Sequence, residues 1–229
     1  MIWLRCSTLE AFRRMQDTPW GDEQELIEYI KAGQTGTSNW MMDAGTAFHA
    51  CLADDPEVVH EGSMLLYNEY GFRRLDVDNS KKLIGAGTNE LTAYKAINVD
   101  GVYVGIRGTC DWINGTMIQD YKCKFTDADP RHYEPSLQWR FYLWIFECSC
   151  FRYNLFSFSE DDSLADDPEG DTYLKLTDTA SFNFWRYPDL EDECHQWLRR
   201  FLGWAEGRQL MGYLDPARNA ETAVMDATA

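Results

Sequence analysis

The stretch that decides the fold is YVGIRGTCDWINGTMIQDYKC, which spans residues 103–123. Two runs of alternating apolar and polar residues flank Asn114-Gly115, and this dipeptide between such runs is a strong signal for a β-hairpin. A further run over residues 90–98 precedes the turn signal Asp100-Gly101. The sequence therefore predicts a three-stranded antiparallel meander, with strands over residues 90–98, 103–113 and 116–123.

Helices are predicted on both sides of the meander. Ser38 can cap a helix that ends at Asp-Asp-Pro (54–56), and Ser136 can cap a strongly apolar helix that runs to about Phe151. The stretch up to about Gly87 is less regular. This order predicts an α/β (α+β) fold, with a central mixed sheet flanked by helices in one domain over residues 1–229. The elements outside the meander are helices over residues 8–16, 22–32, 38–53, 137–151 and about 189–207, strands over residues 153–159, 173–176 and 182–186, and a frayed tail after Pro216.

The hairpin brings polar side chains to one face of the predicted sheet. If Asn114-Gly115 is the whole loop, Asp111 faces Ile118 and Thr109 faces Asp120. Arg107 then faces Lys122. Because side chains alternate along a strand, all five polar residues project from the same face, with Asp111 and Asp120 as diagonal neighbours at about 7–8 Å. Those five residues are Arg107, Thr109, Asp111, Asp120 and Lys122.

Two carboxylates at this spacing can share one hard cation. Mg²⁺ and Mn²⁺ prefer carboxylate oxygen ligands, and a bound cation lowers the pKa of water and clamps phosphate oxygens. A lysine beside the cation can orient that water or stabilise developing negative charge. This chemistry is what phosphodiester hydrolysis needs. The alternative interpretation of Asp-x-Lys is a solvated strand face, since the pattern is weak when taken alone.

Two further patterns flank the meander. His49 lies inside a predicted helix in Gly45-Thr46-Ala47-Phe48-His49, and Gln138 and Tyr142 are one helical turn apart on the helix that follows. Taken alone, each pattern is also compatible with a structural role.

Together these residues resemble the RecB-type branch of the PD-(D/E)XK nuclease superfamily, which includes exonucleases similar to lambda exonuclease. That branch has Gly-x-x-x-His on a helix, Gly-x-x-Asp at a strand end, Asp/Glu-x-Lys on the next strand and Gln-x-x-x-Tyr on the following helix. The chain has the four in this order, and Ser7 to Phe12 is similar to the family's start. The matching segments are 45–49, 108–111, 120–122 and 138–142.

The resemblance implies a restriction-endonuclease-like core over about 38–160 and a role for each site residue. His49, Asp111, Asp120 and the backbone carbonyl of Tyr121 would bind Mg²⁺ or Mn²⁺, and Lys122 would act with Asp111 and Asp120 in catalysis. Gln138 and Tyr142 would contact or position DNA. Arg107, which the predicted register places beside Lys122, is a further candidate for a phosphate contact.

The implied function is a metal-dependent deoxyribonuclease, an exonuclease of DNA recombination, repair or phage DNA processing. Its implied partners are DNA, further copies of the chain, and a single-strand annealing or recombination protein. We expect a cytoplasmic location in a bacterium or a phage-infected cell. No stretch is apolar for long enough to span a bilayer, so no membrane partner is expected.

Charge and cysteine content qualify this hypothesis. The net charge is −17, whereas a DNA-binding surface is normally basic. Part of the excess lies in residues 160–171, which are typical of a solvated acidic loop. The seven cysteines include no Cys-x-x-Cys pair, so free thiols are expected. An iron–sulfur cluster, which some relatives carry, is not expected because Cys194 is the only cysteine after Cys150.

Three alternatives stay open at this point. The chain could be a non-catalytic relative that binds DNA or a partner protein, which the acidic composition favours. It could be a structure-specific or restriction-like endonuclease, which circular DNA would distinguish from an exonuclease. It could also be an acidic inhibitor that mimics DNA, in which case the carboxylates would spread over an exposed face.

Overall fold

The computed structural model describes residues 1–19, 21–36, 38–125, 129–161 and 171–214. Most of the acidic segment and the tail after Pro216 lie outside the described residues. The helices are α1 (Cys6–Asp17), α2 (Glu23–Lys31), α3 (Trp40–Ala53), α4 (Arg74–Ile84), α5 (Leu137–Ile145) and α6 (Leu190–Gly207). The strands are β1 (Ile2–Arg5), β2 (Val59–Glu61), β3 (Met64–Tyr67), β4 (Tyr70–Arg73), β5 (Thr88–Val99), β6 (Val102–Asn114), β7 (Met117–Lys124), β8 (Cys150–Glu160) and β9 (Thr172–Trp185).

The strands form one mixed sheet in the order β1-β6-β7-β8-β9-β4-β3-β2, with β5 paired to β6 off this path. The pairs β1–β6, β7–β8 and β4–β9 are parallel, and the other pairs are antiparallel. The predicted α/β fold, with a central mixed sheet and an antiparallel meander, is therefore confirmed.

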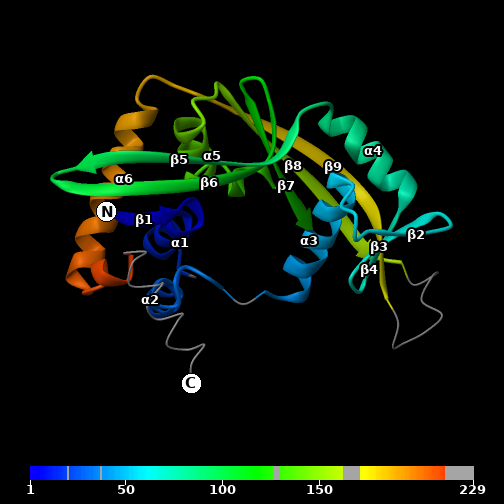
Figure 1. Cartoon of the computed structure of the whole chain (residues 1–229), viewed down its shortest axis with the longest axis horizontal. Coiled ribbons are helices and arrows are strands. Elements are labelled where there is room, and N and C mark those ends of the chain that lie inside the picture. The colour runs from blue at the N-terminus through cyan, green and yellow to red at the C-terminus, as the bar shows by residue number, and fades with distance from the viewer. Residues whose placement is uncertain (20, 37, 126–128, 162–170, 215–229) are drawn as a thin grey trace.

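Helices cover both faces of the sheet, and two apolar clusters hold them there. One cluster joins α1, α5 and α6 to the sheet, and the other joins α3 and α4 to the opposite face. Strand β8 contributes side chains to both clusters, since Tyr153 and Leu155 belong to the first and Phe156 and Phe158 to the second. Figure 1 shows α1, α2 and α6 at the end of the molecule near β1, and α3 and α4 toward the other end.

Several predicted boundaries were wrong. The less regular stretch before Gly87 holds β2, β3, β4 and α4, and β1 was not predicted. The cap of α3 is Asn39 and not Ser38, because the Asn39 side chain accepts a hydrogen bond from Met42 N at 3.1 Å. Helix α5 ends at Ile145, since Glu147 adopts a φ of 56° before β8 begins. The strands predicted over 173–176 and 182–186 are one strand, β9.

The register of the central hairpin also differs from the prediction. Asn114 pairs with Met117 and Ile113 with Ile118, so the two loop residues are Gly115 and Thr116. Gly115 has a φ of 56°, and a glycine at the first loop position is typical of a type II′ turn. If this register is continued, Asp111 lies directly opposite Asp120 and not diagonal to it.

The polar groups that hold α1 against α5 converge on one buried carboxylate. Glu10 accepts hydrogen bonds from Leu137 N at 2.7 Å, from Ser136 Oγ at 3.1 Å and from Arg13 Nη2 at 2.7 Å. Burial alone would raise the pKa of Glu10, but the bonds and charge of Arg13 outweigh it and hold the pKa below its usual value. Glu10 is therefore an ionised anchor that satisfies the first N–H group of α5, that of Leu137.

We expect Glu10→Gln to lower the free energy of unfolding by about 2–4 kcal/mol, because a buried cation loses its counter-charge and an amide N–H₂ meets other donors. Urea denaturation at neutral pH measures this loss. The matched control is Glu206→Gln on the exposed side of α6, which should change stability by less than about 0.5 kcal/mol. Equal stabilities of the two variants would contradict the anchoring role.

Candidate active site

The candidate site lies where β6 and β7 separate. The two strands pair only over residues 112–114 and 117–119. Strand β5 occupies one edge of β6 along nearly its whole length, and β1 pairs with residues 104–107 of β6 on the other edge. A fork therefore opens beside residues 108–111 of β6, between β1 and β7.

Two side-chain hydrogen bonds satisfy the backbone groups that the fork leaves unpaired. Asp111 Oδ2 accepts a hydrogen bond from Tyr121 N at 2.7 Å, and Tyr142 Oη donates to the Thr109 carbonyl at 2.7 Å. The ring of Tyr142 can approach the strand because residue 108 is glycine. A Cβ at that position would lie 3.2 Å from the ring. Asp111 and Tyr142 thus take the place of ladder hydrogen bonds at the fork.

Asp120 is buried in the fork, with 2% of its surface exposed. Lys122 Nζ lies 2.6 Å from its Oδ2, and Gln138 Nε2 donates to its Oδ1 at 2.8 Å. Burial raises the pKa of Asp120 to about 7 against the attraction of Lys122, and the nearby Asp111 charge adds to the increase. The carboxylate is therefore poised between its charged and neutral forms near neutral pH.

Lys122 has the complementary environment. Burial alone would lower its pKa, but the carboxylates of Asp120 and Asp111 outweigh burial and raise it. The side chain therefore stays an ammonium at neutral pH. It can stabilise negative charge or orient a water molecule, and it is a poor acceptor for a proton.

A chain of buried hydrogen bonds connects Asp120 to α1. Tyr153 Oη donates to Gln138 Oε1 at 3.3 Å, which turns the Gln138 amide N–H₂ toward Asp120. The Tyr153 hydroxyl also lies 3.4 Å from Ser136 Oγ, which in turn donates to Glu10. These five residues come from α1, β7, the start of α5 and β8, so their contact is a product of the tertiary fold.

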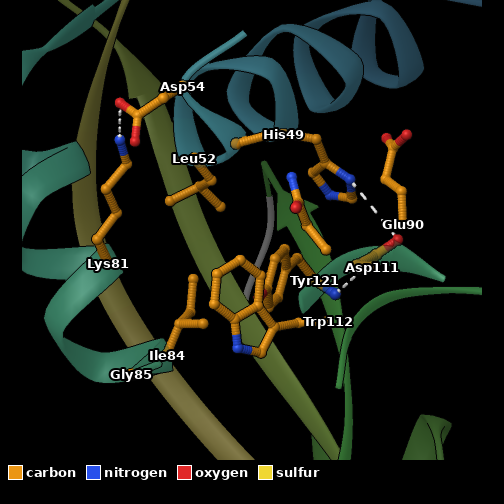
Figure 2. A pocket seen from close by; sticks show the side chains of 12 residues that line it. His49, Leu52, Asp54, Lys81, Ile84, Gly85, Glu90, Asp111, Trp112 and Tyr121 are labelled. Atoms are coloured by element: carbon orange, nitrogen blue, oxygen red, sulfur yellow. Dashed lines mark hydrogen bonds and ion pairs between the residues drawn. The ribbon is translucent and has the colours of Figure 1, made fainter. Parts of the chain in front are cut away.

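His49 reaches the site from α3, on the opposite face of the sheet. Its Nδ1 lies 3.8 Å from Asp111 Oδ1, and Figure 2 shows the imidazole turned toward that carboxylate while Tyr121 N bonds to it from below. The four segments that resemble the nuclease motifs therefore meet in space, although they span residues 45 to 142.

The site residues divide between two pockets. The first, called here the large pocket, has a volume of about 880 Å³ and is lined in part by Arg107, Thr109, Lys122, Gln138 and Tyr142. The second, the small pocket, has a volume of about 130 Å³ and includes His49, Asp111 and Tyr121 in its wall. The prediction that five polar residues share one open face was incomplete, since Asp111 lines the small pocket and Asp120 is buried.

Three residues around the site were missed in the sequence. Glu10 and Tyr153 belong to the hydrogen-bonded chain, and Glu90, in β5, lines the small pocket beside Asp111. Glu10 falls within the segment similar to the family's start, which is a weak signal. Nothing in the sequence pattern distinguishes Tyr153 or Glu90 from their neighbours.

The donors present have the chemistry of a site for a hard divalent cation, namely two carboxylates and an imidazole. These donors do not yet form a complete set of metal ligands. Within the part of the chain that the structure describes, no three His, Cys, Asp or Glu side chains stand close enough together to hold a metal ion. Lys122 holds the Asp120 oxygen that faces the fork. All seven cysteines are free, and six of them are buried.

No family model matches the sequence, and no curated protein matches it. Among solved structures, the chain is similar to SSO0001 at 15% identity and a TM-score of 0.46, over 89% of this chain and 76% of that one. It is also similar to an alkaline exonuclease (LHK-Exo) from Laribacter hongkongensis at 14% identity and a TM-score of 0.43, over 96% and 94% of the two chains. A phage-related exonuclease from Haemophilus somnus 129PT matches at 12% identity and a TM-score of 0.38, over 96% of both chains.

Two of these three structures are exonucleases, the class that the sequence motifs resemble. In addition, no helix among the described residues has the length and apolar character needed to cross a membrane.

We expect Asp111→Asn to keep the fork intact, because an asparagine carbonyl can still accept the hydrogen bond from Tyr121 N. Asp111→Ala leaves that N–H without its partner and should lower the free energy of unfolding by about 1–3 kcal/mol. Chemical denaturation of both variants measures the difference. Asp78→Ala, at an exposed position on α4, is the control and should stay close to the wild type. If Asp111→Ala were as stable as Asp111→Asn, the hydrogen bond would not hold the fork.

Proposed function

We propose that this protein is a divalent-metal-dependent deoxyribonuclease that removes nucleotides from DNA ends. The observation that supports this proposal most directly is the convergence of four short, separated segments on two neighbouring carboxylates. Asp120 pairs with Lys122 and accepts a hydrogen bond from Gln138, and the charge of Asp111 raises its pKa. His49 approaches Asp111 from the other face. A solvated strand face would leave Asp120 exposed, whereas this carboxylate is buried at a fork in the sheet.

The proposed DNA site is the large pocket. Its wall contains the cations Arg5, Arg14, Arg107 and Lys122 and the carboxylates Glu10, Asp22 and Glu25, of which Arg13 neutralises Glu10. Arginine and lysine neutralise phosphates in nucleic-acid complexes, and such contacts position the backbone. These four cations are proposed to make the phosphate contacts on a chain whose net charge is −17.

The residues proposed to hold Mg²⁺ or Mn²⁺ are His49, Asp111 and Asp120, with the backbone carbonyl of Tyr121. When bound, such a cation would supply an activated water and stabilise charge on the scissile phosphate. Lys122, released in part from Asp120, would donate hydrogen bonds to the phosphate or to the attacking water. Gln138, which Tyr153 holds in place, keeps Asp120 in one orientation.

Gln138 and Tyr142 line the large pocket, but their polar atoms bond to Asp120 and to the Thr109 carbonyl. We therefore propose that both residues act first on the site itself, and that the DNA strand meets the parts of them that line the pocket. Arg107, exposed on β6, is proposed to contact a phosphate in the same pocket.

The proposed biological setting is recombination, repair or phage DNA processing in the cytoplasm of a bacterial or phage-infected cell. There, resected DNA is passed to an annealing or recombination protein. A ring or dimer of this chain would bring further cations to this pocket. Circular DNA separates this proposal from an endonuclease, because only an enzyme that needs an end leaves it uncut.

Asp120→Asn and Lys122→Met should each lower the cleavage of end-labelled linear DNA by at least about 10³-fold, because each removes a charge that the reaction needs. Both variants should keep the circular dichroism spectrum of the wild type. Lys82→Met, at an exposed position on α4, is the control and should cleave normally. Cleavage that persists in both site variants would rule out this site as the place of the reaction.

Cation binding should strengthen as the pH rises through 7. Burial raises the pKa of Asp120, so a proton competes with the cation below that pH and is absent above it. Mn²⁺ should therefore raise the melting temperature more at pH 8 than at pH 5.5, as measured by differential scanning fluorimetry. In Asp120→Asn the increase in melting temperature that Mn²⁺ produces at pH 8 should be much smaller than in the wild type. A Mn²⁺ effect of equal size at both pH values in the wild type would contradict a role for Asp120 as a ligand.

A further inference from the structure

The small pocket lies on the far side of the carboxylates from the large pocket. Its wall comes from α3, α4, β5, β6 and β7, and Asp111 and His49 stand at one side of it. The large pocket is bordered by α1, α2 and α5, with Lys122 in its wall. Asp120 is buried between the two. A phosphate bound at the carboxylates would therefore have one pocket on each side.

The inner wall of the small pocket is apolar and aromatic. Figure 2 shows Leu52, Ile84 and Trp112 around one space, with Tyr121 behind them and His49 at the side of Asp111. A flat heterocycle gains from such a lining, because bases stack on aromatic side chains with little regard to sequence. Aliphatic walls on the remaining sides exclude water from the faces of the ring.

The volume limits what can enter. An engineered protein cavity of about 150 Å³ holds one benzene molecule, and this pocket has about 130 Å³. One six-membered ring therefore fits, with its substituents and sugar at the open mouth. The two fused rings of a purine would leave part of the base at the open mouth, outside the apolar lining.

The charge at the mouth limits the occupant further. Asp54 and Glu90 are exposed there, and Asp54 forms an ion pair with Lys81, so Glu90 keeps an acidic rim beside Asp111. A neutral base can pass this rim, whereas a second phosphate beyond the first would be repelled. The pocket therefore suits a single terminal nucleotide and not a continuing strand.

We propose that the small pocket holds the base of the nucleotide being cut from the end of the strand, and that it favours a pyrimidine. This inference rests on the proposed nuclease function for the identity of the strand. It assigns Trp112, Leu52 and Ile84 to the recognition of that base, and it gives the reaction a step of one nucleotide.

Mononucleotides test the pocket without any cleavage, because they contain no phosphodiester bond between nucleotides. We expect dTMP to bind the whole chain in the presence of Mn²⁺ at least about tenfold more tightly than 2-deoxyribose 5-phosphate, as measured by isothermal titration calorimetry. We expect dAMP to bind more weakly than dTMP. Equal affinities for dTMP and the sugar phosphate would overturn the proposal, and so would tighter binding of dAMP.

A variant at the mouth locates the binding. Asn89 is exposed and lines the pocket, so Asn89→Trp should fill the mouth without disturbing the core and lower the affinity for dTMP to that of the sugar phosphate. Thr179→Trp, at an exposed position on β9, is the matched control and should bind dTMP as the wild type does. Unchanged dTMP binding in Asn89→Trp would overturn the assignment to this pocket.

The two proposals can fail separately. If dTMP binds as expected and Asn89→Trp prevents it while linear DNA is never cut, the pocket assignment stands and the nuclease function falls. If linear DNA is cut but dTMP binds no better than the sugar phosphate, the nuclease function stands and the pocket assignment falls.

Discussion

One hydrogen bond, from the Tyr121 amide to the Asp111 carboxylate, spans the point at which β6 and β7 part. Regular pairing would have continued past residue 111 and would have closed the space between the strands. The Asp111 carboxylate takes the place of a backbone acceptor for β7. On β6, the Tyr142 hydroxyl donates a hydrogen bond to the Thr109 carbonyl. The fork can stay open because side chains, and not the neighbouring strand, form the hydrogen bonds that the Tyr121 N–H and the Thr109 carbonyl require.

The same fork concentrates unfavourable electrostatics. Asp120 is withdrawn from water, lies near a second carboxylate and has its pKa raised, which is a loss of stability in the absence of a cation. Lys122 offsets part of that loss, and the Gln138 amide offsets a further part. The Asp120 carboxylate therefore does not stabilise the folded state. Functional sites are where destabilised ionisable groups of this kind gather.

Sequence reasoning identified what is local and missed what is not. The meander, the Ser136 cap and the four motif segments depend on residues close together in the chain, and the structure contains each of them. The predicted register of the hairpin was wrong because Asn114-Gly115 is compatible with two turns. In one turn the glycine takes the first loop position, and in the other it takes the second. Strands β2 to β4 were not predicted because they have only three or four residues each. Helix α4 was not predicted because its N-cap residue, Arg73, makes no side-chain capping hydrogen bond. Glu10 contacts residues of α5 that lie more than a hundred residues further along the chain. No local sequence pattern predicts this contact or the contacts of Tyr153.

The parallel pairing of β1 with β6 has a consequence for the order in which the molecule forms. Residues 2–5 pair with residues 104–107 of β6, and β4 pairs with residues 172–174 of β9. A nascent chain cannot close either contact until about a hundred further residues have left the ribosome. The β6–β7–α5 unit, by contrast, is contiguous and can assemble early. Because residues 104–107 precede β7 and α5 in the chain, β1 can pair with β6 while the fork assembles, and only the β4–β9 pair must form after it.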